Sequence, residues 1–388
     1  MKVRRGIFIA LWVLSLIAIS FYGGAISYGF FFGMTLIPVI SFIYLVCVYL
    51  CFRIYQKLES RNTVCGEAVP FYFTLQNDGF CAIAGISVRL YSSFSFVENL
   101  PDDIEYELLP GDQFRYDTKL ICKYRGEYEV GVKELIVTDF LKLIRMTYKV
   151  PGSVKARVLP KLVHLEALGS ISEIMAFLQK ESQTERTEPD IIVRDYMAGD
   201  AIKQIHWKAS AKEGKLKTRN LIGEEKQGIS ILFDTKRYDK DIQMFLPLEN
   251  KMLETVLALG LFFAEKNMPL SVLYGQRGMK RSRVEGLKSF DAIYTELSEV
   301  VFDKEENPTA IFDQALQQGE LYKSRLVLCV FHEMNAEIIG MAEQLDDSGV
   351  ATVIYVITDQ NMEEYLKQCG ELTKIVVIPV EAELEGIL

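Results

Sequence analysis

The stretch "VRDYMAGDAIKQIHWKASAKEGKLKTRN", residues 193–220, gathers side chains that could bind an anion. Its basic residues after Asp200 are Lys203, Lys208, Lys212, Lys215, Lys217 and Arg219. The whole chain has a net charge of −9, so this stretch is a basic island in an acidic protein. Asp200 is placed to cap a short helix by accepting hydrogen bonds from free backbone N–H groups. A capped helix start beside lysine ammonium groups is a recognised kind of anion site.

The same stretch also has a structural interpretation. Trp207 offers a large apolar face with a single N–H donor. Arg194 could pair with Asp200 or with a neighbouring carboxylate while Trp207 packs beneath the pair. Buried polar side chains usually belong to satisfied hydrogen-bond networks, which favours a lock between two domains over an anion site. The spacing of the residues alone does not separate the two interpretations.

A second candidate site follows the apolar run "GISILF", where Asp234, Lys236 and Tyr238 are spaced Asp-x-Lys-x-Tyr. Ligands of open α/β sheets bind at the carboxyl ends of the strands. The spacing is similar to the Asp-x-Ser-x-Ser pattern of von Willebrand factor A-like domains, whose oxygens hold a divalent cation. A lysine ammonium group repels a cation and could pair with Asp234 instead, whereas the cation prefers several oxygen ligands. We therefore predict a degenerate site that holds no metal, and we predict no cofactor.

Other catalytic patterns are absent from the sequence. It contains no GxxxxGK[ST] loop, no GxSxG elbow and no HExxH, and no GxGxxG follows the first strand of the α/β pattern. The three histidines are isolated, and the seven cysteines are scattered without a CxxC pair, which predicts reduced thiols rather than zinc or disulfide sites. The acidic chain has no nucleic-acid-reading motif. We therefore expect neither an enzyme nor a nucleic-acid-binding protein.

The N-terminal region predicts a membrane hairpin. Gly6–Phe52 contains no charged residue and no histidine. One helix of that length would run roughly 70 Å, over twice the thickness of a hydrocarbon core. We therefore expect two spans, Ile7–Tyr22 and Phe30–Phe52, joined at the glycine-rich "FYGGAISYG". No small-residue cleavage site precedes a polar start, so the first span is not a signal peptide.

The charges that flank this hairpin predict its orientation. The basic residues on the two sides are Lys2, Arg4 and Arg5 before it and Arg53, Lys57 and Arg61 after it. Positively charged flanks stay on the cytoplasmic side, and the turn carries no charge. We expect two spans in a cell membrane, with both ends and all later domains in the cytoplasm.

The rest of the chain predicts two soluble domains. About seven short strands without helices between them indicate a β-sandwich at 59–160. In "FRYDTKLICKY", alternation predicts one buried face, made of Phe114, Tyr116, Thr118, Leu120, Cys122 and Tyr124. A capping-box helix at Ser170 and Glu173 and the basic motif would fill 161–225. From 226 to 388, apolar strands alternate with amphipathic helices, which predicts a doubly wound, mostly parallel sheet covered on both faces. With the hairpin at 1–58, the chain is multidomain.

The basic motif resembles the signature of the "domain of unknown function 58" family, Arg-x-Tyr-x-x-Gly-Asp, then Ile-x-Trp-Lys-x-Ser-Ala, then Leu-x-x-Arg. The matching residues are Arg194, Tyr196, Gly199, Asp200, Ile205, Trp207, Lys208, Ser210, Ala211, Leu216 and Arg219. The stretch "YRGEYEVGVKELIVTDFLKLIR" is similar to a second pattern of that family, Arg-Gly-x-Tyr followed by Asp-x-Phe-Gly-Leu. Lys142 replaces the glycine of that pattern.

This resemblance covers nearly the whole chain. It implies a prokaryotic membrane protein with a membrane hairpin, a β-sandwich and a von Willebrand factor A-like domain. Such proteins are commonly encoded beside MoxR-type AAA+ ATPases and transglutaminase-like membrane proteins, which are the expected partners besides the lipid bilayer. It implies no particular reaction.

Two functions follow from these observations. The first is a membrane-anchored adaptor or scaffold that acts through contacts with the ATPase, and the expected contact face comprises Asp234, Lys236, Arg237 and Tyr238, because strand carboxyl ends form the crevice of such sheets. The alternative is a membrane-anchored sensor or enzyme that binds an anionic ligand at the Arg194–Lys208 motif.

Overall fold

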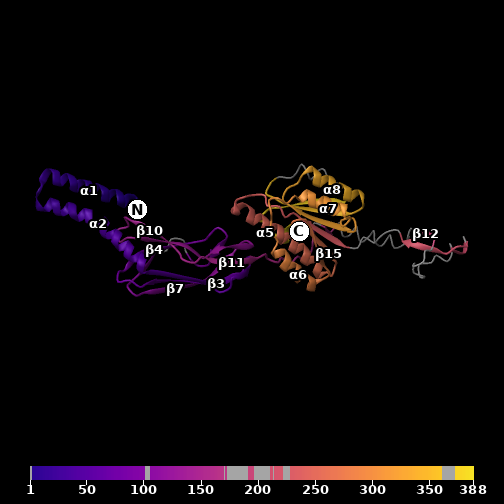
Figure 1. Cartoon of the computed structure of the whole chain (residues 1–388), viewed down its shortest axis with the longest axis horizontal. Coiled ribbons are helices and arrows are strands. Elements are labelled where there is room, and N and C mark those ends of the chain that lie inside the picture. The colour runs from indigo at the N-terminus through magenta and orange to yellow at the C-terminus, as the bar shows by residue number, and fades with distance from the viewer. Residues whose placement is uncertain are drawn as a thin grey trace. The chain divides into compact units, whose positions relative to one another are not determined.

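A computed structural model describes residues 2–100, 105–169, 171–172, 191–195, 210–212, 214–221, 228–360 and 372–388 (Figure 1). The chain divides into two compact units, Met1–Lys161 and Leu162–Leu388. The first contains the apolar helices and an all-β domain, and the second contains an α/β domain.

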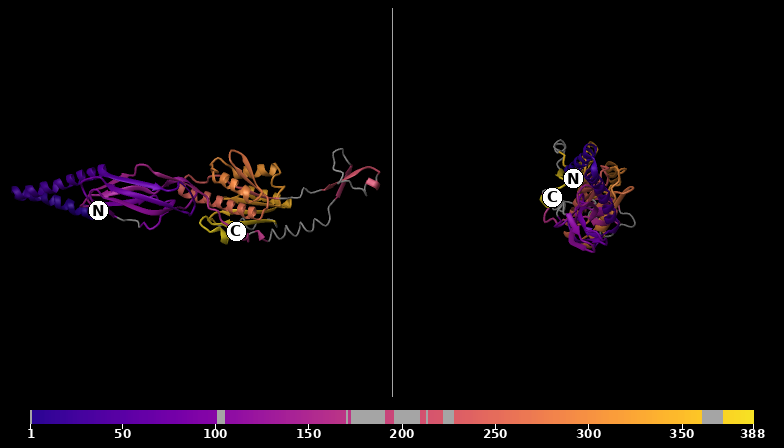
Figure 2. Two further views of the ribbon diagram at one scale, coloured as in Figure 1. Left: turned by 90° about the horizontal axis from the view of Figure 1, so that it is seen from below. Right: turned by 90° about the vertical axis from the view of Figure 1, so that its left-hand side faces the viewer.

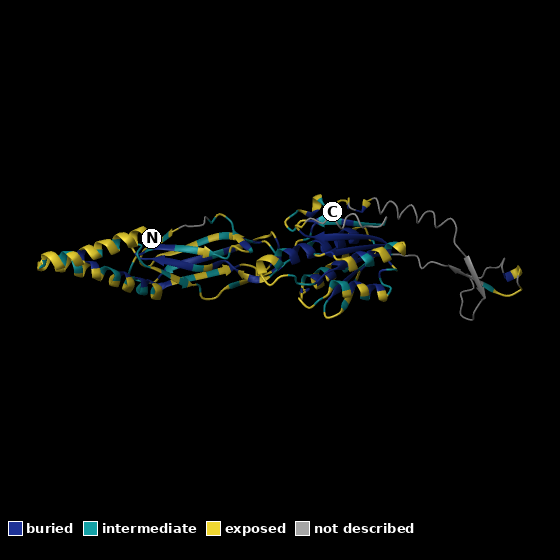
Figure 3. Ribbon diagram, turned by 90° about the horizontal axis from the view of Figure 1, so that it is seen from above, coloured by how far each residue is buried: buried dark blue, intermediate teal, exposed yellow. Residues whose placement is uncertain are grey.

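The first unit begins with two antiparallel helices, α1 (Lys2–Tyr22) and α2 (Gly24–Cys51), which are long enough and apolar enough to cross a membrane. The turn between them is tight because Gly23 and Gly24 adopt φ angles of 55° and 85°, a region that favours glycine. The indole Nε1 of Trp12 donates to Thr35 Oγ1 at 3.1 Å, which sets the register of the pair. Helix α2 begins at Gly24, six residues before Phe30, where the second span was predicted to begin. Figure 3 shows exposed positions along both helices.

Three sheets follow in the first unit (Figure 2). One antiparallel sheet has the order β1 (Phe52–Leu58), β3 (Ala68–Asn77), β7 (Gln113–Cys122), β5 (Ser95–Val97). The second has the order β10 (Arg145–Lys149), β9 (Val132–Thr138), β4 (Ile83–Leu90), β6 (Glu105–Leu108). The third has the order β2 (Asn62–Val64), β11 (Val154–Leu159), β8 (Gly126–Val130). We refer to these strands together as the sheet domain.

The predicted buried face of β7 is only half correct. Leu120 and Cys122 are fully buried, but Phe114 is 38% exposed, and Tyr116 is half-buried. The two aromatic side chains lie at the end of the sheet, where their rings contact the neighbouring ring of Tyr106 or Phe73 instead of being enclosed. Alternation identified the correct face, but enclosure depends on which part of the strand other elements cover.

The α/β domain has one six-stranded sheet. Its order is β16 (Met279–Val284), β15 (Leu270–Gly275), β14 (Ile229–Phe233), β17 (Leu326–Phe331), β18 (Ala351–Ile357), β19 (Thr373–Ile378). All neighbouring pairs are parallel except β15 with β16, so the prediction of a mostly parallel sheet is confirmed. The stretch "MEEYLKQCGEL" at 362–372, whose pattern predicts one of the covering helices, lies outside the described residues apart from its last residue.

Helices cover both faces of this sheet. Helices α5 (Ile242–Glu265) and α6 (Leu287–Ser298) share a core with Ile231 and Phe233 of β14. Helices α7 (Pro308–Gln317) and α8 (Ala336–Asp347) lie on the other face of the sheet (Figure 1). They share a second core with Leu232 of β14. Successive side chains of a strand point to opposite faces, so β14, which is buried at every position, contributes to both cores. A short 3₁₀ turn at Leu384–Gly386 ends the chain.

The segment predicted as a linker contributes to the second unit. Val163, Leu165, Leu168 and Ile171 are buried in the core that contains α5 and α6. Most of the predicted capping-box helix, including Ser170 and Glu173, lies outside the described residues. Further along the chain, β12 (Ile191–Asp195) and β13 (Lys217–Leu221) form an antiparallel two-stranded ribbon.

Candidate functional site

The centre of the six-stranded sheet creates a crevice at its carboxyl ends. From β14 the chain passes to β15 on one side and later returns to β17 on the other. Connections that leave in opposite directions open a space between the ends of two adjacent strands, where ligands of such sheets bind. Asp234 follows β14 directly, and its N–H donates to Val330 O of β17 at 2.9 Å. The switch point therefore carries Asp234 on one strand end and His332 on the other.

The carboxyl group of Asp234 is buried and bonded within its own loop. The residue is only 2% exposed. Its Oδ1 accepts from the backbone N–H of Lys236 at 2.7 Å, and its Oδ2 accepts from the hydroxyl of Tyr238. Burial raises the pKa of Asp234 to about 7, although both hydrogen bonds and the charge of Lys236 act in the opposite direction. A carboxyl group that titrates near neutral pH at a switch point is a mark of a functional site.

The side chain of Tyr238 closes the crevice. Its ring meets His332 edge to face at 4.7 Å between centroids, and Lys236 Nζ lies 4.7 Å from the Tyr238 ring centroid. The Nδ1–H of His332 donates to the carbonyl of Ile357 at 2.7 Å, which orients the imidazole. Burial and the neighbouring Asp234 raise the pKa of Tyr238. The Lys236 ammonium group therefore lies over the aromatic ring, and the carboxylate interaction suggested by the sequence is made by the Lys236 backbone N–H instead.

These contacts explain why the Asp-x-Lys-x-Tyr loop is poorly suited to hold a metal ion. Both oxygens of Asp234 already accept hydrogen bonds, and the Lys236 charge is close by. A cation would have to displace the Tyr238 hydroxyl and still find further oxygen ligands. Within the described ranges, no group of three or more His, Cys, Asp or Glu side chains is arranged to hold a metal ion. The arrangement is a closed, protonatable carboxyl site.

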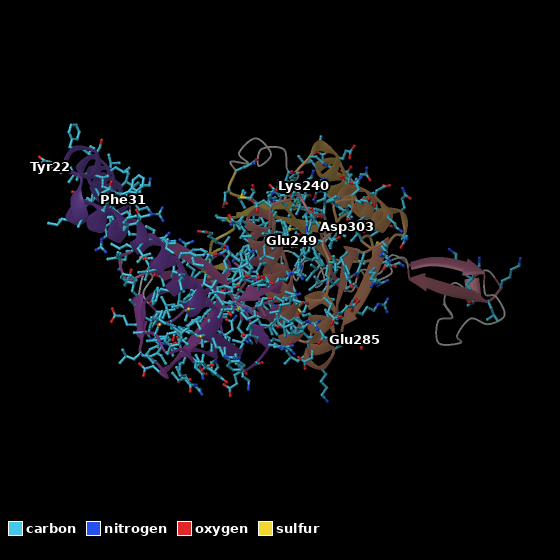
Figure 4. All side chains as sticks on the ribbon, turned by 60° about the vertical axis from the view of Figure 1, so that its left-hand side comes forward. Tyr22, Phe31, Lys240, Glu249, Glu285 and Asp303 are labelled. Atoms are coloured by element: carbon cyan, nitrogen blue, oxygen red, sulfur yellow. The ribbon has the colours of Figure 1, made fainter. Side chains whose placement is uncertain are left out.

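Arg237 is part of an internal ion pair. Its Nε donates to Glu249 Oε1 at 2.6 Å and its Nη2 to Oε2 at 3.2 Å, while Glu249 is only 3% exposed. The guanidinium carbon lies 4.1 Å from the ring centroid of Phe245. Arg237 and Tyr238 both make contacts within the domain while remaining partly exposed, so the expected contact face at these residues stays a prediction. Figure 4 labels Glu249 together with Lys240 and Asp303 of this region.

A second group beside the crevice was not predicted from the sequence. Thr235 Oγ1 donates to the carbonyl of Gly275 at 2.7 Å. Glu306 Oε1 accepts from the N–H of Arg277 at 2.9 Å. A Cβ atom at Gly275 would lie 2.8 Å from Glu306 Oε2 and 2.9 Å from Thr235 Oγ1, so a larger residue there would force one of these side chains to shift. Thr235, Gly275 and Glu306 line a shallow recess beside Asp234. The glycine at the end of an apolar strand was the one sequence signal available.

The basic motif is only partly described. The ribbon pairs Arg194 with Thr218 and Val193 with Arg219, so the backbone at Arg194 belongs to a strand. Ser210 is 9% exposed, and its Oγ accepts from the N–H of Lys217 at 2.8 Å. This bond connects the two halves of the motif. The remaining signature residues outside the described part are Tyr196, Gly199, Asp200, Ile205, Trp207 and Lys208.

Comparisons with known proteins assign no family. No family model matches the chain, and no curated protein matches it. Solved structures that align with it include proximal thread matrix protein 1 from the mussel byssus, with a TM-score of 0.29 and 12% identity over 38% of this chain and 43% of that one. The secreted serine protease VesC from Vibrio cholerae has a TM-score of 0.21 and 14% identity over 34% and 27%. The alignments span less than half of either protein, and at these TM-scores they assign neither fold nor function.

Proposed function

We propose that this protein is a membrane-anchored adaptor. The two apolar helices hold it in a prokaryotic cell membrane, and the domains after Arg53 lie in the cytoplasm. Its α/β domain is a von Willebrand factor A-like module that contacts a MoxR-type AAA+ ATPase, with a transglutaminase-like membrane protein in the same assembly. The support is the central β14 followed by Asp234, the antiparallel edge strand β16, and the motif resemblance.

The observation that carries this proposal is the closure of the switch-point crevice. Tyr238 donates a hydrogen bond to Asp234 and packs on His332, so its side chain covers the carboxyl group, and the recess beside Asp234 is shallow. A closed crevice favours contact with a macromolecule over turnover of a small substrate. Its exposed rim carries both charge signs, as the edges of protein interfaces do. The rim residues are Asp239, Lys240, Lys304, Glu305 and Glu333.

The exposed lysines of this rim allow a direct test. The full chain in lipid nanodiscs is titrated with the AAA+ ATPase encoded beside it, with ATP, with ADP and without nucleotide. We expect nucleotide-dependent binding that Lys240→Glu with Lys304→Glu weakens about tenfold, or about 1.4 kcal/mol. The matched control is Lys288→Glu with Lys323→Glu, two exposed lysines at the opposite end of the strands, where the same change in charge should leave binding unaltered.

The outcomes separate the two functions. Equal weakening by both variants would mean that net charge, and not the rim, controls binding. If the intact chain binds the ATPase in none of the nucleotide states, the adaptor proposal is rejected. The sensor or enzyme with an anionic ligand at the Arg194–Lys208 motif then becomes the better explanation.

A further inference from the structure

Contacts with the sheet domain fix one level along the two helices of the hairpin. Arg5 Nε donates to the carbonyl of Leu143 at 2.6 Å. Ser41 Oγ donates to Asp139 Oδ2 at 3.1 Å, and both residues are buried. Because Trp12 faces Thr35, Arg5 and Ser41 lie at about the same level of the two helices. The parts of the helices beyond this level are Gly6–Tyr22 and Gly24–Ile40, each about 25 Å long at 1.5 Å per residue.

This level places one end of the sheet domain at the membrane surface, if the hairpin spans the membrane as proposed above. About 25 Å of helix is at the lower end of what crosses a hydrocarbon core. Charged side chains are costly inside that core, so Arg4 and Arg5 must lie at the level of the headgroups. The contacts of Arg5 and Ser41 then bring the loop 139–144 to the same level.

The loop 139–144 is fixed in a conformation that exposes apolar side chains. Asp139 Oδ1 accepts from the N–H of Ile144 at 2.7 Å, and Oδ2 accepts from the N–H of Leu141 at 3.3 Å. Lys142 has a φ of 56°, a region that favours glycine, which explains why a glycine fits the family pattern there. Phe140 is 50% exposed and Leu141 is 38% exposed. The tight loop therefore presents two large apolar side chains outward.

Two neighbouring loops add apolar side chains at the same end. Phe80 is 80% exposed in the turn after β3, where the N–H of Asp78 donates to the carbonyl of Cys51 at the end of α2. Leu109 is 64% exposed, and its carbonyl accepts from Asn77 Nδ2 at 3.1 Å. In the described part of the sheet domain, the other large exposed apolar side chains lie on strands: Tyr55, Phe96 and Phe114.

Helix α2 links these loops to the hairpin. Tyr44 OH donates to the carbonyl of Ala82 at 2.8 Å, and the Tyr44 ring contacts Phe140 edge to face at 5.7 Å. Arg53 and Arg145 are exposed beside this end, and Arg53 is partly neutralised by Asp78 at 2.7 Å. Basic side chains around an apolar tip suit the anionic headgroup region of a bilayer.

We propose that this end of the sheet domain is a lipid-docking surface. Phe80, Leu109, Phe140 and Leu141 enter the headgroup and upper acyl region of the leaflet that surrounds the hairpin. Two helices and three loops then hold the domain at a fixed angle to the bilayer. The occupant is the bilayer because the surface is continuous with the apolar helices and lies at the level that the arginines define.

The depth of individual positions tests this inference. An environment-sensitive fluorescent amino acid is incorporated into the full chain at position 140 and, in separate samples, at 96 and 13. The chains are reconstituted in liposomes of zwitterionic and anionic lipids whose acyl chains carry bromine, a short-range quencher. Phe96 is the matched control, since it is 44% exposed and pairs with Ile121, roughly 24 Å of strand from Phe114 in β7. Val13, in the middle of α1, reports insertion of the hairpin.

We expect strong quenching at 13, clear quenching at 140 and none at 96. A label at Leu109 should be quenched like that at 140, and it provides the test if substitution of Phe140 disturbs its contact with Tyr44. If position 13 is quenched but 140 and 109 resemble 96, the hairpin inserts and the lipid-docking surface does not exist. If position 13 is not quenched, membrane anchoring itself fails.

Discussion

The hydroxyl of Tyr238 donates a hydrogen bond to Oδ2 of Asp234, four positions earlier in the chain. The Asp-x-Ser-x-Ser pattern of von Willebrand factor A-like domains has a serine at this spacing. Here the longer side chain reaches back to the carboxylate and uses one of its oxygens, while the N–H of Lys236 uses the other. The loop thus fills its own site, and the predictions below follow from that closure.

Tyr238→Phe should destabilise the α/β domain by about 1–3 kcal/mol, because it removes one donor from a buried carboxyl group. The measurement is hydrogen exchange of peptides from β17 and β18 in the full chain, which reports opening of this domain. The control is Tyr322→Phe, which removes a hydroxyl from another half-buried tyrosine of the α/β domain, one that does not contact Asp234. Equal protection in the parent and in Tyr238→Phe would mean that the hydrogen bond contributes nothing.

The stability of the α/β domain should fall as the pH rises from about 4 to about 7. Burial raises the pKa of Asp234 from 3.8 to about 7, so the folded state holds a proton that the unfolded state has released. Ionising the buried carboxyl group costs at most roughly 4 kcal/mol, because each pKa unit corresponds to about 1.36 kcal/mol. Above pH 7 this contribution is lost and the dependence levels off.

Asp234→Asn isolates this effect because the amide does not ionise. The variant should lack the decline between pH 4 and 7 and should exceed the parent in stability at pH 8. The measurement is exchange of the same β17 and β18 peptides, corrected for the intrinsic pH dependence of exchange. A parent and a variant with the same slope would show that another group titrates.

Arg237→Ala should destabilise the α/β domain by roughly 3–5 kcal/mol, because it removes the guanidinium group that pairs with the buried carboxylate of Glu249. Replacing both residues, as Arg237→Met with Glu249→Leu, should cost less, since the buried carboxylate is also removed. Urea denaturation of the full chain in detergent, with β17 and β18 followed by exchange, gives both values. A smaller loss in Arg237→Ala than in the double variant would contradict an essential ion pair.

Much of the α/β domain could be predicted because its strands are buried on both faces. The run "LVLCVF" of β17 is buried at every position, and a continuous apolar run of that length is a clear signal. The edge strand β16 was missed because "MKRSRV" buries only Val284. Helix α7 was missed although Asn307 and Pro308 gave a readable helix start. Strand β1 was missed because it continues directly from α2.

The candidate site was only partly predictable for a different reason. Asp234 could be found from the sequence because it directly follows a buried strand. The residue after a strand must lie at the carboxyl end of that strand. Its partners His332 and Glu249 depend on tertiary packing, which no local pattern encodes. Tyr238 lay within the pattern, but it was interpreted as a missing metal ligand. Its capacity to donate a hydrogen bond to Asp234 was the signal that could have revealed a closed site.

Magnesium should leave the stability of the protein unchanged. A ligand that binds only the folded state raises stability in proportion to its occupancy. With both Asp234 oxygens engaged and Lys236 nearby, the cation gains too few oxygen ligands to displace the internal donors. Exchange of the β14 and β17 peptides in millimolar magnesium and in chelator should therefore coincide.

The comparison variant is Lys236→Ser with Tyr238→Ser, which introduces both serines of the metal-binding pattern and releases Asp234 Oδ2. Any protection by magnesium should arise in this variant and not in the parent. Protection of the parent that Asp234→Ala abolishes would show that other loops complete a metal site around the carboxylate, and that the Tyr238 hydroxyl yields to the cation.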